Sequence, residues 1–168
     1  MNTLASSRSG LRPGYLTVRP GAVLEEPRTF TSLQIANVSG ATLRQLQWWD
    51  EKRYVSPVHE GHRRVYSMED AVLCSIIAQL LAAGDSLQKI RKIIAALRTD
   101  KRIGNAIKDN SNLWIIVGRR QVNRFTSKYS GVKFAFSLES VSDEIKVMNQ
   151  YFLLIAVHDL IDRLEVFK

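Results

Sequence analysis

The segment Gly40–Asp50 reads GATLRQLQWWD and carries the signals of a turn followed by a helix. Gly40, together with the serine before it, supplies the turn. Thr42 is a typical N-cap, and Gln45 three residues later completes a capping box. The spacing therefore predicts a helix that begins near Leu43.

This helix has two faces of different character. Spacings of three residues place the apolar side chains of one face together: Leu43, Leu46 and Trp49. Spacings of three and four place a second set on another face: Arg44, Gln47 and Trp48. Side chains at these spacings share a face of a helix, so we expect the first set to pack on a core and the second to point outward.

The elements on either side extend the pattern. Leu33 to Val38 predicts a short helix before the turn, and a small hairpin follows, with strands at Tyr54–Val58 and Arg63–Tyr66 around residues 59–62. Two further helices follow, capped by Ser67 and Ser86 and separated at Gly84. Their apolar stripes are Val72, Leu73, Ile76, Ile77, Leu80 and Leu81 in the first, and Leu87, Ile90, Ile93, Ile94 and Leu97 in the second. The order helix, turn, helix, hairpin, helix, helix predicts a mainly α fold with a small β wing, a winged helix-turn-helix, over residues 29–98.

Residues 99–168 show a weaker pattern, which predicts a small α+β region. Thr99, Asp100 and Gly104 interrupt any continuation of the preceding helix. The expected elements are a short helix over Lys101–Lys108, a break at residues 110–112, strands at Leu113–Val117, Gln121–Phe125 and Phe134–Leu138, and a helix over Val141–Gln150. Tyr151–Phe167 can form a strand running into a helix or one continuous helix, of which the first is favoured because Phe152–Ile155 is apolar without a break.

Residues 1–28 are predicted to be a flexible basic tail. They hold three of the four prolines and lack a hydrophobic period. The absence of acidic residues before Glu25 is also typical of organelle transit peptides, but Pro13 and Pro20 would break the amphipathic helix that such peptides form.

Composition limits the classes of function. The chain has 24 Lys and Arg against 16 Asp and Glu, a formal charge of +8, which favours a polyanionic partner. No apolar run approaches the roughly 20 residues of a membrane span. The single cysteine, Cys74, cannot form an internal disulfide, so we expect a soluble protein of the reducing cytoplasm.

Several short motifs occur in order with the spacings of the MerR family of winged helix-turn-helix transcriptional regulators, and the chain resembles that family over about residues 30–98. They are Ile35-Ala36, Gly40–Thr42, Gln45-Leu46, Trp48–Asp50, Val55–Pro57, Gly61–Ser67, Asp70, Leu80 and Ala83–Ile90. Arg44–Trp49 is most similar to a branch in which the second helix reads Arg-Gln-Leu-x-aromatic-Trp.

The resemblance implies roles for individual residues. Leu46 and Trp49 would belong to the core, and the set implied to bind double-stranded DNA is Thr42, Arg44, Gln47, Trp48, Arg63, Arg64 and Tyr66. An arginine on the second helix can pair with a guanine edge or a phosphate in the major groove. At least one of Arg63 and Arg64 on the wing is expected to contact phosphate.

The chain departs from the family pattern at three positions. Gln47 stands where many relatives have arginine, which makes Arg44 more important. Ser32 stands where an apolar residue is usual. Arg53 replaces a common glycine before the hairpin, a position at which glycine's conformational freedom is expected to matter.

The leading hypothesis is therefore a homodimeric regulator of transcription that reads a palindrome and has RNA polymerase as a further partner. There are two alternatives. One is an excisionase-like or architectural factor that bends DNA without an effector, and the other is a protein-interaction adaptor. Relatives dimerise through a long helix after the fourth one. Here the interruption after Arg98 shifts the expected contact to residues 101–168, with their apolar segments Leu113–Val117 and Phe152–Ile155.

No enzyme, cofactor or metal site is predicted. The chain offers no set of nucleophile, base and orienting group, and no glycine-rich phosphate loop. His59 and His62 have a spacing that metal sites use, but no third ligand is evident, so polar residues of a hairpin tip are the favoured interpretation. No cysteine follows the fourth helix, which argues against a thiophilic metal effector.

Overall fold

The computed structural model describes residues 28–109, 111–123, 126–147 and 151–166. The predicted tail lies outside these residues except for Arg28, whose guanidinium pairs with the carboxylate of Glu165 near the other end of the chain. The elements in chain order are β1 (Thr29–Thr31), α1 (Ser32–Ser39), α2 (Leu43–Glu51), β2 (Val58–Glu60), β3 (Arg63–Ser67), α3 (Met68–Ala82), α4 (Leu87–Thr99), α5 (Arg102–Asp109), β4 (Trp114–Asn123), β5 (Thr126–Ala135), α6 (Leu138–Val147), β6 (Tyr151–Ala156) and α7 (Val157–Glu165).

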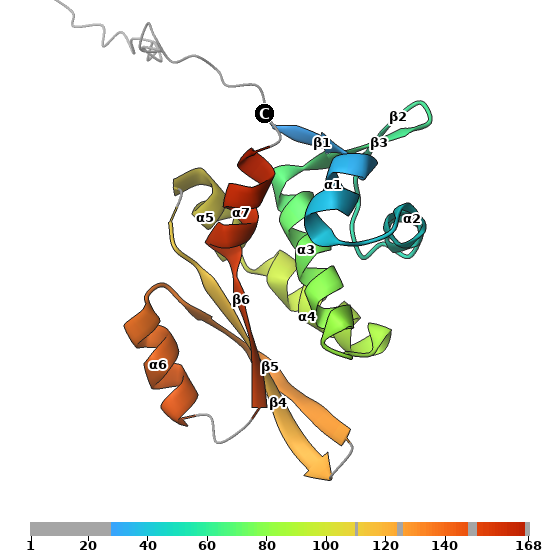
Figure 1. Cartoon of the computed structure of the whole chain (residues 1–168). Helices are drawn as coiled ribbons and strands as arrows, with labels where there is room; N and C mark the ends of the chain where they lie inside the picture. Colours follow the sequence, from blue (N-terminus) through green and yellow to red (C-terminus); the bar gives the residue numbers. More distant parts are fainter. Residues whose placement is uncertain (1–27, 110, 124–125, 148–150, 167–168) are drawn as a thin grey trace, which may run out of the picture.

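The predicted fold class is confirmed: helices dominate, with a small antiparallel wing and an α+β region after it (Figure 1). None of the described helices is both long and apolar enough to cross a membrane.

The helix-turn-helix consists of α1 and α2. Gly40 ends α1 in the left-handed conformation (φ 73°), and its N–H donates to the carbonyl of Ala36. Thr42 then caps α2 as predicted: its hydroxyl accepts from the Gln45 N–H, while the Gln45 side chain accepts from the Thr42 N–H at 2.8 Å. The turn and the cap fix where α2 starts, and therefore which of its faces points outward.

The wing is a three-stranded sheet in the order β1-β3-β2, not the isolated hairpin expected. β1 was not anticipated, because three residues are too short to show a period. The first predicted strand begins only at Val58; Tyr54 and Val55 are instead buried in the loop after α2. Arg53 in that loop adopts φ 59°, a conformation that favours glycine, which agrees with the expectation that the conformational freedom of glycine matters at this position.

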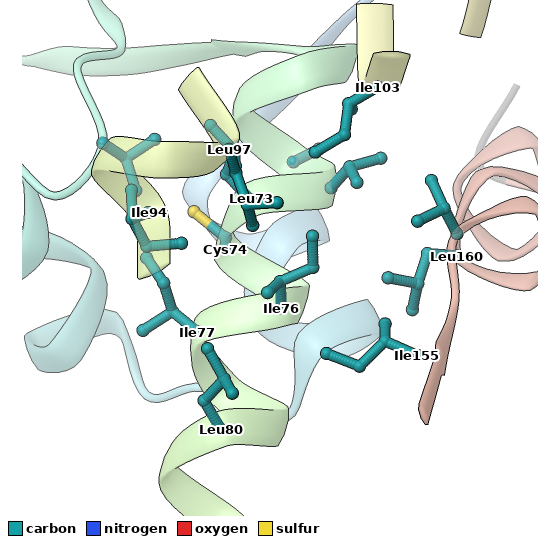
Figure 2. Packing of buried hydrophobic residues seen from close by; sticks show 14 of the residues in the cluster. Leu73, Cys74, Ile76, Ile77, Leu80, Ile94, Leu97, Ile103, Ile155 and Leu160 are labelled. Atoms are coloured by element: carbon teal, nitrogen blue, oxygen red, sulfur yellow. The ribbon is translucent and has the colours of Figure 1, made fainter. Parts of the chain in front are cut away.

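Helix α3 is the centre of the molecule. It is buried nearly all round, since α1, α4, α5 and α7 all pack against it. Figure 2 shows Ile76 and Ile77 of α3 among side chains of α4, β6 and α7, including Leu97, Ile155 and Leu160. A helix that neighbours cover on several sides needs apolar residues beyond a single stripe.

The C-terminal region differs from the expectation in its strands. Residues 114–123 form one long strand where two paired strands were expected, and β4 lies between β5 and β6 in an antiparallel sheet. The strand expected over Phe134–Leu138 was wrong, because β5 ends at Ala135 and α6 begins at Leu138. The expectation of a strand followed by a helix at the end of the chain is confirmed by β6 and α7.

This sheet joins the two predicted regions through one core. Ile115, Val117 and Ile155 point into the cluster built around α3, whereas Trp114 and Ile116 on the opposite face pack with Val141 of α6. Helix α6 accordingly lies on the far side of the sheet from α3 and α4 (Figure 1). The apolar segment Leu113–Val117, which we expected to support self-association, is buried within the chain. The division at residue 98 stays a prediction.

Candidate nucleic-acid interface

An open hollow of about 590 Å³ lies where α1, α2 and β3 meet on the surface. Its lining combines four of the residues singled out from the sequence with three others. The lining residues are Ser32, Leu43, Arg44, Gln47, Trp48, Glu51 and Arg64. The structure thus brings the outward face of α2 and one wing arginine together around a single concave surface.

The polar residues of α2 differ in how freely they can act. Arg44 is exposed and makes no ion pair with any residue that the structure describes. Gln47, also exposed, donates from Nε2 to Oε1 of Glu51 at 2.8 Å. A ligand that uses the Gln47 amide must therefore compete with Glu51, whereas the Arg44 guanidinium is available at once.

Leu43 does not belong to the packed face of α2, contrary to expectation. Leu46 and Trp49 are buried as predicted, but Leu43 is 53% exposed and lines the hollow. It is the first residue of the helix, so the core does not extend far enough to cover it.

Trp48 is held between the core and the hollow. Its ring stacks on that of Tyr54 with centroids 5.5 Å apart, and the Tyr54 hydroxyl donates to the carbonyl of Leu87 at the start of α4 at 3.2 Å. The half-buried indole is therefore fixed in orientation by the loop after α2, with part of its surface toward the hollow.

Thr42 sits at the N-terminus of α2, where its hydroxyl takes part in the capping box. Its backbone and side chain are committed to starting the helix, so the described geometry gives Thr42 a role in placing α2.

The two wing arginines face different surroundings. Successive residues of a strand point to opposite sides. Arg64 is largely covered and lines the hollow, whereas Arg63 is exposed and does not line it. Arg64 also donates from Nε to Oδ2 of Asp50 at 2.7 Å. Asp50 is the last residue but one of α2.

Sequence reasoning missed that contact and its third member. His59, opposite Arg64 in the β2–β3 register, places Nε2 2.8 Å from the same Oδ2 of Asp50. Asp50, His59 and Arg64 lie 5 to 14 positions apart, on a helix and two strands. A local sequence pattern therefore gives no signal of this cluster. The sequence predicts His59 at a polar hairpin tip, whereas the structure places it within β2. Among the described residues no group of three His, Cys, Asp or Glu could hold a metal ion.

Tyr66 requires a correction. It was placed in the interface, but its side chain is 0% exposed, opposite Phe30 in the β1–β3 register. Burial raises the pKa of its phenol. In this structure Tyr66 is a core residue: it belongs to the main hydrophobic cluster, and α1 and α3 pack against β3.

Comparison with known families agrees with this geometry. Residues 30–97 match the family described as MerR HTH family regulatory protein. This part of the chain, which holds α1 to α4 and the wing, is therefore similar to the helix-turn-helix domain of the MerR family.

The curated relatives carry names of the same kind. An uncharacterized HTH-type transcriptional regulator of Mycobacterium bovis and one from each of two strains of Mycobacterium tuberculosis are each 28% identical to this chain over 106 residues. The aligned region covers 57% of this chain and 47% of each relative. The chain thus spans about half the length of the curated relatives it matches.

Proposed function

We propose that this protein is a sequence-specific double-stranded DNA-binding regulator of transcription, which reads the major groove with α2 and holds the flanking backbone with its wing. One observation supports the proposal: the outward face of α2, in the part of the chain that matches the MerR family, and a wing arginine line the same open hollow. Both cations, Arg44 and Arg64, are thereby presented on one side of the molecule.

The proposed roles follow from the chemistry of each group. The free Arg44 guanidinium can form paired hydrogen bonds with a guanine edge or clamp a phosphate. The Trp48 indole can lie against the backbone, and Gln47 can reach an adenine edge after leaving Glu51. Thr42 contributes by starting α2 in the correct place, and Arg63 adds exposed positive charge on the wing.

We further propose that two copies act together on a palindrome, because one helix of this size reads only a half-site and a two-fold dimer matches two of them. Double-stranded DNA, a second copy of the chain and, by analogy with the family, RNA polymerase are the proposed partners. Catalysis has no part in the proposal, and the names of the relatives likewise describe transcriptional regulators.

Selection of bound duplexes from a random-sequence library tests this proposal. We expect a consensus with two inverted half-sites separated by about one helical turn or a multiple of it. Sedimentation of the protein with the selected duplex should show two copies per DNA. Recovery of no consensus would contradict sequence-specific reading, and recovery of bent or A·T-rich DNA without a common half-site would favour an architectural factor.

Salt dependence provides a second check. The proposed interface consists largely of cations and polar groups, so the logarithm of the affinity should fall linearly with the logarithm of salt concentration, by about 0.9 per phosphate contact. An affinity that stays constant through the physiological range of salt would mean that phosphate contacts do not drive binding.

A further inference from the structure

Asp50 connects the proposed reading helix to the wing. Its Oδ2 atom accepts from Arg64 Nε on β3 at 2.7 Å and lies 2.8 Å from His59 Nε2 on β2. The Asp50 side chain is 15% exposed and that of Arg64 24%, so water screens this pair much less than an ion pair on the open surface. Side chains of α2, β2 and β3 therefore meet at one carboxylate oxygen.

The contact leaves most of Arg64 available. A guanidinium has five N–H donors in a fixed fork, and the hydrogen bond from Arg64 to Asp50 uses the one on Nε. The two terminal nitrogens remain beyond the bond to Asp50, on a side chain that lines the hollow together with Arg44. Holding the fork at Nε reduces the rotamer freedom that a long side chain would otherwise lose on binding.

Charge alone predicts the opposite role for Asp50. A carboxylate close to a surface that binds a polyanion repels it, so its removal should strengthen binding to DNA. The geometry instead gives Asp50 a partner on the wing and little contact with solvent.

We propose that Asp50 is a positioning residue that selects Arg64, and not Arg63, as the wing arginine that contacts a DNA phosphate. By fixing Nε of Arg64, Asp50 directs the end of the guanidinium toward a phosphate of the strand that Arg44 contacts, and His59 supports the same oxygen from β2. Arg63 has no such support and lies outside the hollow. This inference rests on the proposed function and names the wing contact within it.

The test compares Asp50→Asn with the parent protein on a fluorescently labelled duplex of the selected sequence, by anisotropy. We expect Asp50→Asn to bind at least about fivefold more weakly, as for loss of one charge-assisted contact, although it removes a negative charge. Asp50→Glu, which keeps the carboxylate, should recover part of the loss. Binding by Asp50→Asn that equals or exceeds that of the parent would overturn the proposal.

Double variants separate positioning from a general structural effect. Asp50→Asn should have almost no further effect on Kd in an Arg64→Gln background, and its full effect in an Arg63→Gln background. Equal effects in the two backgrounds would overturn the selection of Arg64. The slope of affinity against salt should decrease by about one on Asp50→Asn, a change that loss of fold stability alone does not produce.

Arg64→Lys and Arg63→Lys keep the test decisive if Asp50→Asn fails to fold. A lysine preserves charge but cannot bond Asp50 and a phosphate with the same planar fork, so Arg64→Lys should weaken binding and Arg63→Lys should not. Equal affinities of these two variants would overturn the proposal. Arg44→Ala, measured in parallel, separates failure of the proposed function from failure of this inference. Normal binding by Arg44→Ala contradicts the proposed function itself. Weaker binding by Arg44→Ala together with normal binding by Asp50→Asn contradicts this inference alone.

Discussion

Cys74 lies at the centre of α3, where Figure 2 shows it beside Leu73 and Ile77 and close to Leu97 of α4. The side chain is fully buried. Burial raises the pKa of the thiol well above its ordinary value of 9.0, and the nearby carboxylate of Asp70 raises it further, while Arg98 opposes the rise. The cysteine is therefore a small apolar packing residue.

Thiol labelling tests this environment. The reactive species is the thiolate, which is scarce and inaccessible in the folded protein, so we expect a disulfide reagent at neutral pH to react only as fast as the protein opens. In denaturant the rate should be that of an ordinary cysteine. Because folding raises this pKa, its contribution to stability is complete below the unfolded value and is lost as pH rises above about 9. Rapid, complete labelling of the native protein would contradict the packing.

Single residues were predictable where helical spacing decides their burial. Leu46 and Trp49 follow from a three-residue spacing, and their burial needed no knowledge of the rest of the chain. Leu43 has the same spacing but begins the helix, and Tyr66 lies in the cluster that forms where α1 and α3 pack against β3. Both errors arise because burial depends on what packs from elsewhere in the chain.

At the scale of elements, the end of α1 depends on the backbone of Gly40. A Cβ placed there would meet nothing within 4 Å, so the cost of another residue comes from the φ of 73° alone. We expect Gly40→Ala to destabilise the protein by about 1–2 kcal/mol, measured by thermal or denaturant unfolding. Gly40→Asn should cost less, since asparagine tolerates this conformation better.

Gly104 is the matched control. It lies within α5 at an ordinary helical φ, and a Cβ would come no closer than 3.9 Å to Oε2 of Glu69. Gly104→Ala should therefore stabilise the protein by about 0.5–1 kcal/mol. If the two alanine variants changed the free energy of unfolding in the same direction, the backbone explanation of the α1–α2 turn would be wrong.

The elements after residue 99 could be predicted only in part. The helix α7 and the strand before it carry clear local patterns, and both were found. The long strand β4 was divided in the prediction because Gly118 and Arg119 resemble a turn, whereas the structure has a register shift at that point and continues the strand. Pairing with β5 and β6 holds the strand together across the irregularity, and such non-local pairing leaves little trace in a local pattern.

At the scale of the whole molecule, the C-terminal region completes the core of the helix-turn-helix unit. Leu160 and Ile161 of α7 are buried in the same cluster as Ile76 of α3. We expect Leu160→Ala to lower the free energy of unfolding by about 2–5 kcal/mol. Because the core is shared, fluorescence of the tryptophans in α2 and β4 should report a single transition. Two separate transitions, with the one for α2 unchanged, would show independent units.

The account depends most directly on whether the outward face of α2 reads DNA, and affinity of Arg44→Ala for the selected duplex measures this. Arg163→Ala is the matched control, because it removes the same charge from an exposed position on α7 away from the hollow lined by Arg44.

We expect Arg44→Ala to unfold at the temperature of the parent and to bind the selected duplex about five- to a hundredfold more weakly, with a smaller loss on a scrambled duplex. Arg163→Ala should bind nearly as the parent does. An Arg44→Ala variant that binds its selected site as tightly as the parent, or no more weakly than Arg163→Ala, would show that α2 is not the reading helix.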